Sequence, residues 1–298
     1  MKNKKIKIVF CIVILLCIIT GEYFAYERLY GKNATTNNIH MSIGEKVKSR
    51  VEAELLDLNF IGGFDEEDGK VVNDDRGIPV IGYHSIGDDP TGENPLVISP
   101  EKFREQLEKL VEKGYTTLTM EQVQNYLIND EPIPAKSVLL TFDDGYEDNY
   151  TNAFPILKEF NMHATIFVIP GYLNSGVYLS SDQVKEMSDS GLIDIESHTY
   201  SHKRLSELSY ENQLNELVSS KKALSDLTGK EVTAIAYPEG LYNDDTLKAV
   251  AEAGYKTGFT IERGYADRED NMYKLNRVCV DNTYAGKNIL YVLKYINK

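Results

Sequence analysis

From residue 78 to the C-terminus, short apolar runs alternate with amphipathic segments, and no other feature of the sequence constrains the fold as strongly. A strand that is followed by a helix and then by another strand produces a parallel sheet covered by helices. Seven or eight such units in about 220 residues favour a barrel over an open sheet. We therefore predict that residues 78–298 form an α/β barrel.

The elements of this barrel are predicted from the spacing of apolar residues and from the turn residues between them. The predicted strands are 80–83, 116–119, 137–142, 164–169, 193–196, 232–237 and 256–260. The predicted helices are 100–113, 120–128, 150–160, 181–190, 210–227, 244–253 and 287–296. In such a barrel the chemistry is found at the carboxyl ends of the strands.

The first 26 residues carry a separate signal. Four lysines within the first seven residues precede an uncharged apolar run, 8–20. This layout is typical of an export signal, and no small-residue cleavage site follows it. The run is short for a membrane-spanning helix, but the aromatic residues after it could extend it into the interface. We expect an uncleaved signal-anchor at 1–26, with the rest of the chain outside a bacterial cell membrane, in preference to cleavage and secretion.

Residues 27–77 are predicted to form a stalk. A small, polar stretch at 31–38 precedes the capping-box pattern Ser42 to Glu45, which opens a predicted helix through about residue 58. The segment 62–76 is rich in glycine, aspartate and asparagine and is typical of a linker. We therefore expect the domain boundary near Gly77, with a single domain at 78–298.

Net charge limits the classes of binding partner, and cysteine content indicates how the domain is stabilised. The chain has 46 acidic and 32 basic side chains, a formal net charge of −14 at pH 7. Because such a chain repels phosphates, its charge argues against nucleic acid or anionic lipid as the main partner. Of the three cysteines, only Cys279 lies outside the apolar N-terminal run, so the domain must be stabilised by its core and not by a disulfide.

Polar residues follow four of the predicted strands. Carboxyl ends of parallel strands lie at one edge of a sheet, so these side chains are expected to lie close together. They are His84 after 80–83, Asp143 and Asp144 after 137–142, His198 and His202 after 193–196, and the segment 238–240 after 232–237.

Two of these groups suggest a metal site. His198 and His202 would lie on one face of the chain if their segment were helical, although two surface histidines by chance explain this pair equally well. Asp143 and Asp144 also fit a plain turn at a strand end. However, two adjacent carboxylates at a barrel mouth are costly unless a cation neutralises them. One aspartate with two histidines gives a three-ligand site with open positions, which is the catalytic arrangement.

These motifs resemble a known family. Thr-Phe-Asp-Asp-Gly at 141–145 and His-Thr-Tyr-Ser-His at 198–202, about 55 residues apart, resemble the first two motifs of the polysaccharide deacetylases, carbohydrate esterase family four, also called the NodB homology domain. The resemblance covers about residues 78–280. It implies a deformed (β/α)7-type barrel that removes acetyl groups from N-acetylated sugars with a divalent metal, usually Zn²⁺.

The resemblance also implies roles for single residues. Asp144, His198 and His202 would be the metal ligands, and Asp143 would be the general base. The metal would activate a water molecule, and the neighbouring carboxylate would remove its proton during attack on the acetamide carbonyl. A backbone N–H near Tyr146 would help to stabilise the oxyanion.

The later motifs depart from the family pattern. The usual Arg-x-Pro-x-Gly is Ala-Tyr-Pro-Glu-Gly at 236–240, so the arginine that orients the base is missing there. Arg277 is a candidate replacement, and Tyr237 and Pro238 are expected to line the substrate or oxyanion site. The usual late histidine is also absent. His84 resembles the acid of the branch that acts on poly-N-acetylglucosamine, although a histidine with a structural role at a strand end is the alternative.

The sequence therefore predicts a metal-dependent hydrolase that removes N-acetyl groups from N-acetylglucosamine residues of a cell-surface polysaccharide. Poly-N-acetylglucosamine and peptidoglycan both fit, and the position of His84 favours the first. Two alternatives stay open. Without the usual arginine and late histidine, the chain could bind carbohydrate without hydrolysing it, although the retained Asp143 counts against this. The same chemistry would also suit an esterase that removes O-acetyl groups.

Overall fold

The computed structural model describes residues 70–282 and 286–295, and these belong to one compact unit, Glu66–Lys298. The predicted signal-anchor at 1–26 and the part of the predicted stalk at 27–69, including its helix, lie outside the described residues. Val71–Val72, at the end of the predicted stalk, pairs antiparallel with Ile133–Pro134 in a small sheet that is separate from the central one. None of the helices within the described ranges has the length and apolar character needed to cross a membrane.

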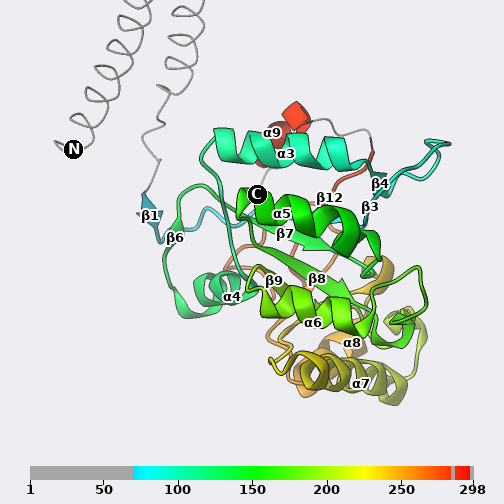
Figure 1. Cartoon of the computed structure of the whole chain (residues 1–298). Helices are drawn as coiled ribbons and strands as arrows, with labels where there is room; N and C mark the ends of the chain where they lie inside the picture. The colour runs from blue at the N-terminus through cyan, green and yellow to red at the C-terminus, as the bar shows by residue number, and fades with distance from the viewer. Residues whose placement is uncertain (1–69, 283–285, 296–298) are drawn as a thin grey trace, which may run out of the picture. The chain divides into compact units, whose positions relative to one another are not determined.

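A curled parallel sheet forms the centre of the fold (Figure 1). Its strands run in the order β11-β10-β9-β8-β7-β2-β12, and β5 pairs with the start of β7. A parallel bridge from Phe259 to Leu275 joins β11 to the segment that leads into β12, so the two ends of the sheet meet. The strands of this sheet are β2 (Val80–Tyr83), β5 (Thr116–Thr117), β7 (Ser137–Phe142), β8 (Ala164–Val168), β9 (Ile193–Ser197), β10 (Ala234–Ala236), β11 (Thr257–Phe259) and β12 (Val278–Cys279).

Helices connect these strands and cover the sheet, and the last helix packs against α3 (Figure 1). The α-helices are α3 (Pro100–Glu112), α4 (Met120–Asn129), α5 (Phe154–Phe160), α6 (Ser181–Asp189), α7 (Tyr210–Thr228), α8 (Asp244–Glu252) and α9 (Gly286–Tyr295). Shorter elements are the π-turn η1 (Asn149–Ala153), the 3₁₀ turns η2 (Pro170–Tyr172), η3 (Leu205–Glu207) and η4 (Pro238–Gly240), and the strands β1 (Val71–Val72), β3 (Ser85–Ile86), β4 (Val97–Ile98) and β6 (Ile133–Pro134).

Local sequence explains where the helices begin. Thr119 and Gln122 form a reciprocal capping box at α4, and Ser180 and Gln183 do the same at α6. In each pair the hydroxyl accepts a hydrogen bond from the backbone N–H of the glutamine, and the glutamine side chain accepts one from the backbone N–H of the capping residue. Two N–H groups that have no partner within the helix are therefore satisfied. These caps fix the helix starts close to the positions that the sequence predicts.

Two clusters of buried apolar side chains lie on opposite faces of the sheet. Successive residues of β7 divide between them: Val138 and Leu140 pack toward the outer helices, and Leu139 packs on the other face. Met120 and Val123 of α4 belong to this second cluster, so α4 covers the inner face of the curled sheet. Because both faces are covered, β7 is buried along its whole length, as is usual for parallel strands.

The predicted α/β class and the alternation of strands and helices are confirmed, and the curled sheet is consistent with a deformed barrel. The seven predicted strands and seven predicted helices all occur within a few residues of their expected bounds. The predicted helix 150–160 is present, but it divides into the π-turn η1 and the α-helix α5. Pro155 is the physical reason, because it has no N–H to continue an α-helical ladder through this point.

Candidate active site

The end of β7 presents two adjacent carboxylates in different directions. The backbone N–H of Asp143 donates to Tyr83 O at 2.9 Å, which continues the ladder with β2. Asp144 then adopts φ 72° and Gly145 φ 70°. Non-glycine residues rarely adopt this left-handed conformation, and such residues cluster at functional sites. Because of this turn, the carboxylates of Asp143 and Asp144 have different neighbours.

The loop after β9 brings two imidazoles together. The rings of His198 and His202 have centroids 5.0 Å apart. The helical arrangement considered from their spacing is wrong, because residues 198–202 form an irregular loop in which Thr199 has φ 63° and His202 has φ 57°. The His202 N–H donates to Thr199 Oγ1 at 3.1 Å, so the loop is closed by a side-chain hydrogen bond.

Asp144, His198 and His202 form a cluster whose possible ligand atoms all lie within 4.8 Å of one another. Asp144 Oδ1 is 3.4 Å from His198 Nε2 and 3.3 Å from His202 Nε2. His198 is buried, and its other ring nitrogen, Nδ1, lies 2.8 Å from Ala236 O. A carbonyl at that nitrogen fixes the ring and leaves Nε2 directed at Asp144, as is typical of metal-binding histidines.

Asp143 is paired with an arginine from far along the chain. Arg277 Nη1 and Nη2 donate to the two carboxylate oxygens of Asp143, each at 2.7 Å. The guanidinium is fully buried, and its Nε donates to Thr260 O at 2.9 Å. A bidentate pair of this kind is rigid and directional. Arg277 thus lies against Asp143, the predicted base, while the altered motif at 236–240 contains no arginine.

The partners of the two carboxylates control their pKa values. Burial by itself would raise the pKa of Asp143, but the charge and hydrogen bonds of Arg277 outweigh burial and hold this pKa below its usual value. Burial would likewise raise the pKa of Asp144, and the hydrogen bonds with His198 and His202 outweigh it, so this pKa is also lowered. Both carboxylates are therefore ionised at neutral pH.

His84 follows β2, the strand next to β7. Burial lowers its pKa, while the charges of Asp143 and Asp144 act in the opposite direction, which places the imidazole in the field of both carboxylates. Its Nδ1 is buried and has no hydrogen-bond partner among the described residues. The structure thus brings His84 to the same edge of the sheet as the two aspartates.

Tyr146, Tyr237 and Pro238 occupy different kinds of position. The ring of Tyr146 is half-buried, and its backbone N–H makes no hydrogen bond within the described part of the chain. Tyr237 and Pro238 are buried at the end of β10, and the hydroxyl of Tyr237 donates to Tyr273 O at 2.8 Å. The predicted contact of these three residues with substrate stays a prediction.

Sequence reasoning missed Tyr178. This residue forms an antiparallel bridge with Tyr146, and the two rings stack with centroids 5.2 Å apart and planes 15° apart. The ring of Tyr172 adds to the same group at 5.0 Å from Tyr178. Burial and, to a lesser extent, the charge of Asp144 raise the pKa of Tyr178. The only sequence signal was three tyrosines in loops after strands.

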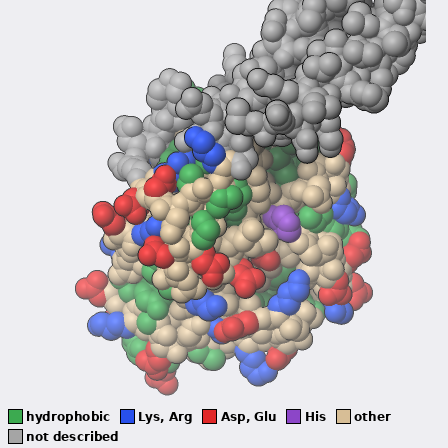
Figure 2. Space-filling view, turned by 90° about the vertical axis from the view of Figure 1, so that its left-hand side faces the viewer, with side chains coloured by type: hydrophobic (Ala, Val, Ile, Leu, Met, Phe, Trp, Pro, Cys, Tyr) green, Lys and Arg blue, Asp and Glu red, His purple; other side chains and the backbone are tan. Residues whose placement is uncertain are grey.

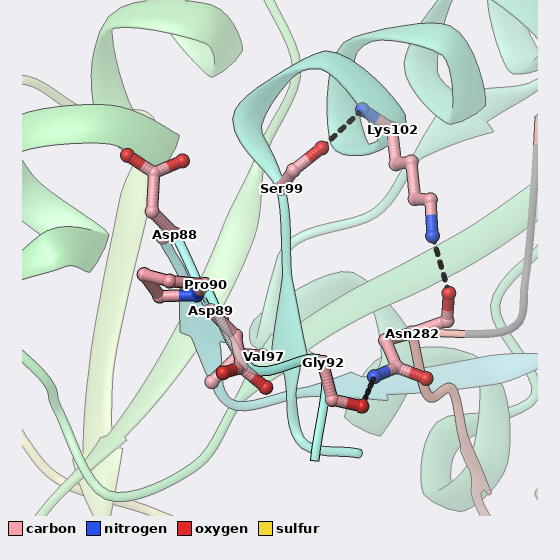
Figure 3. Close-up of a pocket in the computed structure, with 9 residues that line it drawn as sticks. Asp88, Asp89, Pro90, Gly92, Val97, Ser99, Lys102 and Asn282 are labelled. Carbon is pink, nitrogen blue, oxygen red and sulfur yellow. Dashed lines mark hydrogen bonds between the residues drawn. The ribbon is translucent and has the colours of Figure 1, made fainter. Parts of the chain in front are cut away.

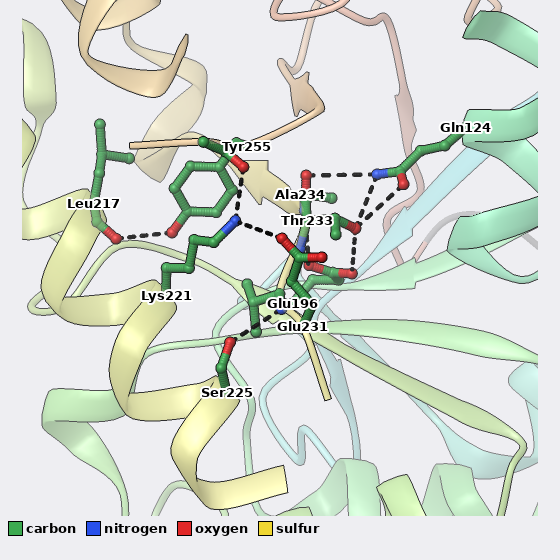
Figure 4. A network of polar contacts seen from close by, with 11 residues as sticks. Gln124, Glu196, Leu217, Lys221, Ser225, Glu231, Thr233, Ala234 and Tyr255 are labelled. Carbon is green, nitrogen blue, oxygen red and sulfur yellow. Dashed lines mark hydrogen bonds and ion pairs between the residues drawn. The ribbon is translucent and has the colours of Figure 1, made fainter. Parts of the chain in front are cut away.

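A buried glutamate lies beneath the site. β9 and β10 share a single register pair, Ile235 with Ser197. Beside it, Glu196 Oε2 accepts the backbone N–H groups of Thr233 at 2.8 Å and Ala234 at 2.7 Å, as Figure 4 shows. The Glu196 carboxyl group thus takes the place of backbone hydrogen bonds between β9 and β10, where these two strands diverge. Burial raises the pKa of Glu196 to about 8, although the two N–H donors oppose it.

This raised pKa predicts how stability depends on pH. Between the pKa of an unfolded glutamate and about 8, only the folded chain keeps the proton of Glu196, so its contribution to stability falls as pH rises. Glu196→Gln accepts the same N–H groups without a charge. We expect its free energy of unfolding, relative to the parent, to increase by up to about 1.4 kcal/mol per pH unit over this range in denaturant titrations. The exposed Glu121→Gln is the control, and a difference that does not vary with pH would contradict the assignment.

A separate cavity of about 430 Å³ lies between the loop after β3 and Asn282 (Figure 3). Asp88, Asp89 and Lys102 contribute polar groups to it, and Lys102 Nζ donates to Asn282 O at 2.5 Å. None of the residues that line this cavity belongs to the predicted site. The cavity and the Asp/His cluster are therefore different features.

A curled parallel sheet with an Asp/His/His cluster and an arginine-paired aspartate at its strand ends defines a barrel of hydrolase type. The family model for polysaccharide deacetylases matches residues 130–258. YxkH of Bacillus subtilis (strain 168), to which polysaccharide deacetylase activity is ascribed, is 40% identical over 209 residues, or 70% of this chain and 73% of that protein. The poly-beta-1,6-N-acetyl-D-glucosamine N-deacetylase of Staphylococcus aureus (strain NCTC 8325 / PS 47) is 31% identical over 198 residues, or 62% of this chain and 68% of that protein.

Solved structures agree with these relatives. The Streptococcus pyogenes deacetylase PplD, in complex with acetate, matches with a TM-score of 0.71 and 34% identity over 74% of this chain and 100% of that chain. The chain belongs to the polysaccharide deacetylase family, whose members are metal-dependent hydrolases of amide bonds. The resemblance inferred from the two motifs is confirmed.

Proposed function

We propose that this protein removes N-acetyl groups from N-acetylglucosamine residues of a cell-surface polysaccharide, with poly-N-acetylglucosamine preferred over peptidoglycan. The observation that carries this proposal is the division between neighbouring carboxylates. Asp143 is held by Arg277, whereas Asp144 faces His198 and His202. Two adjacent acids with different partners are suited to different roles in one reaction. The 31% identical Staphylococcus aureus relative, named for poly-beta-1,6-N-acetyl-D-glucosamine, supports the choice of polymer.

The residues of the cluster fit a divalent metal, with Zn²⁺ the best match. Two imidazole nitrogens and one carboxylate oxygen form a common catalytic zinc donor set. The hydrogen bond between His198 Nδ1 and Ala236 O supplies the outer contact that such ligands usually have. A metal held by Asp144, His198 and His202 would activate water and polarise the acetamide carbonyl.

The surrounding side chains would supply the proton transfers. Asp143 is ionised, and Arg277 occupies one acceptor position on each carboxylate oxygen, so a further position on each remains for a proton from water. His84 would give a proton to the departing amine. The N–H of Tyr146, which has no hydrogen-bond partner in the described part of the chain, would donate to the oxyanion that forms at the carbonyl.

Localisation outside a bacterial cell membrane is part of the same proposal. The predicted signal-anchor at 1–26, with its lysine-flanked apolar run 8–20, would anchor the chain, and the catalytic domain would face the surface polysaccharide. Acidic and basic side chains are intermixed on the face that Figure 2 shows, with no continuous basic surface there. That pattern suits a neutral glycan better than a polyanion.

The test is acetate release from β-1,6-linked and β-1,4-linked N-acetylglucosamine oligomers. We expect release from the β-1,6-linked oligomers, loss of activity after treatment with a chelator, and recovery on addition of Zn²⁺. His202→Ala should bind less metal and release less acetate, because it removes one of three ligands. Metal-loaded protein that releases no acetate from any N-acetylated glycan would exclude the deacetylase. Release from O-acetylated glycans alone would favour the esterase.

A further inference from the structure

The backbone segment that carries His84 is held by side chains at the start of the π-turn η1. Asp148 accepts hydrogen bonds from Ser85 Oγ at 2.5 Å and from Ile86 N at 3.1 Å. Asn149 Nδ2 donates to the carbonyl of His84 at 2.8 Å. The two peptide groups that follow this histidine, together with the Ser85 side chain between them, are thus fixed by two consecutive residues.

The π-turn makes this contact possible. Pro155 cannot donate a backbone hydrogen bond, and the N–H of Phe154 bonds to Asn149 O five residues earlier. A turn with an extra residue changes which side chains share a face, and such turns are frequent at functional sites. Here Asn149 and Asn152 both reach the segment after β2, the second through a 2.8 Å bond from Nδ2 to Ile86 O.

Asn149 has one possible amide orientation. Its Nδ2 donates to His84 O and, at 3.0 Å, to Asp148 Oδ1, so both amide hydrogens are used. Reversing the amide would direct its oxygen at two acceptors. In the observed orientation, Asn149 Oδ1 is buried without a partner among the described residues. An unpaired buried acceptor costs free energy of folding. Asn149 nevertheless keeps this orientation, in which its amide nitrogen bonds to the His84 carbonyl and its oxygen stays unpaired.

The imidazole of His84 has no comparable support. Its Nδ1 is buried without a hydrogen-bond partner within the described ranges, whereas Nδ1 of His198 is fixed by Ala236 O. A histidine ring is usually oriented through its second nitrogen. For His84 the direction of the ring must instead follow from the position of its backbone.

We propose that Asn149 and Asp148 are positioning residues for His84, and that they hold its backbone so that the imidazole faces the departing amine. This inference rests on the proposed function, in which His84 is the acid. It adds a role for two residues that touch neither the metal cluster nor the reacting atoms. We call the hydrogen bonds from Asp148 and Asn149 to residues 84–86 the clamp. Small displacements of an acid slow proton transfer steeply, so loss of the clamp is expected to lower kcat more than it changes KM.

The test is a double-mutant cycle on the zinc-loaded protein, measured as acetate release from a β-1,6-linked oligomer. Asn149→Ala should lower kcat by about ten- to a hundredfold with little change in KM. In a His84→Ala background the same substitution should change kcat by less than about twofold, because the group that it positions is gone. Equal losses in both backgrounds would overturn the proposal and assign Asn149 a general structural role.

Control variants keep the test decisive. Thr151→Ala lies on the same π-turn, and within the described residues the Thr151 hydroxyl hydrogen-bonds to Glu147 alone, so this variant should leave kcat unchanged. If Asn149→Ala fails to fold, Asp148→Asn retains one acceptor oxygen and should lower kcat in the same direction. The ring signals of His84 in nuclear magnetic resonance give a readout without substrate. If Asn149→Ala leaves those signals unchanged, the positioning role of Asn149 is rejected, whether or not the protein releases acetate. If the signals shift but the parent protein releases no acetate, only the proposed deacetylase activity is rejected.

Discussion

Asp143→Asn should lower kcat for acetate release by about 10² to 10⁴, which is the range for loss of a general base. The amide has nearly the same shape as the carboxylate, but it cannot accept a proton from water. The three predicted metal ligands are unchanged, so zinc content should equal that of the parent. The measurement pairs acetate release with metal analysis of the same samples.

Asp144→Asn is the matched comparison, because the two substitutions are chemically identical and adjacent in the chain. It removes the charge of a predicted ligand, so zinc content should fall together with activity. If Asp143→Asn keeps more than about a tenth of the parent rate, Asp143 is not the base. If it instead loses zinc, the assignment of the two carboxylates is reversed.

Sequence patterns predicted the parts of this site that depend on local chemistry. The apolar strand 137–142 ends at Asp143 and Asp144, and a strand end can be recognised from a run of buried side chains followed by a turn. The sequence also placed His198 and His202 after β9. It could not predict their geometry, because the loop depends on left-handed conformations at Thr199 and His202, where no glycine marks the position.

Contacts between distant segments were harder to predict. Arg277 lies 134 positions after Asp143, next to a strand of only two residues, so no periodic pattern indicates its register. It could be proposed only from the absence of the usual arginine at 236. The clamp around His84 was missed for a similar reason, because a π-turn has no sequence period of its own and Asn149 resembles any polar residue at a helix start.

Replacing Arg277 with methionine should destabilise the fold by about 3–5 kcal/mol, the usual cost of leaving a buried charge without its partner. In the parent, the pKa of Asp143 is lowered, so the pair stabilises the fold above the unfolded pKa and this contribution is lost as pH falls through the folded pKa. Without the guanidinium, burial dominates and raises this pKa. The stability of Arg277→Met should therefore decrease as pH rises, which is the opposite sign.

A second substitution separates the charge from the packing. Adding Asp143→Asn to Arg277→Met removes the unpaired carboxylate, so the double variant should be more stable than Arg277→Met alone at neutral pH, as measured by urea unfolding with a chelator present. It should not recover fully, because Thr260 O still loses the hydrogen bond from Arg277 Nε. Arg277→Lys keeps a charge but cannot bond both carboxylate oxygens in the same way, and its stability should lie between those of the parent and Arg277→Met. If Arg277→Met and the double variant are equally stable, the charge of Asp143 does not require Arg277 as its partner. The proposal that Arg277 keeps Asp143 ionised would then be rejected.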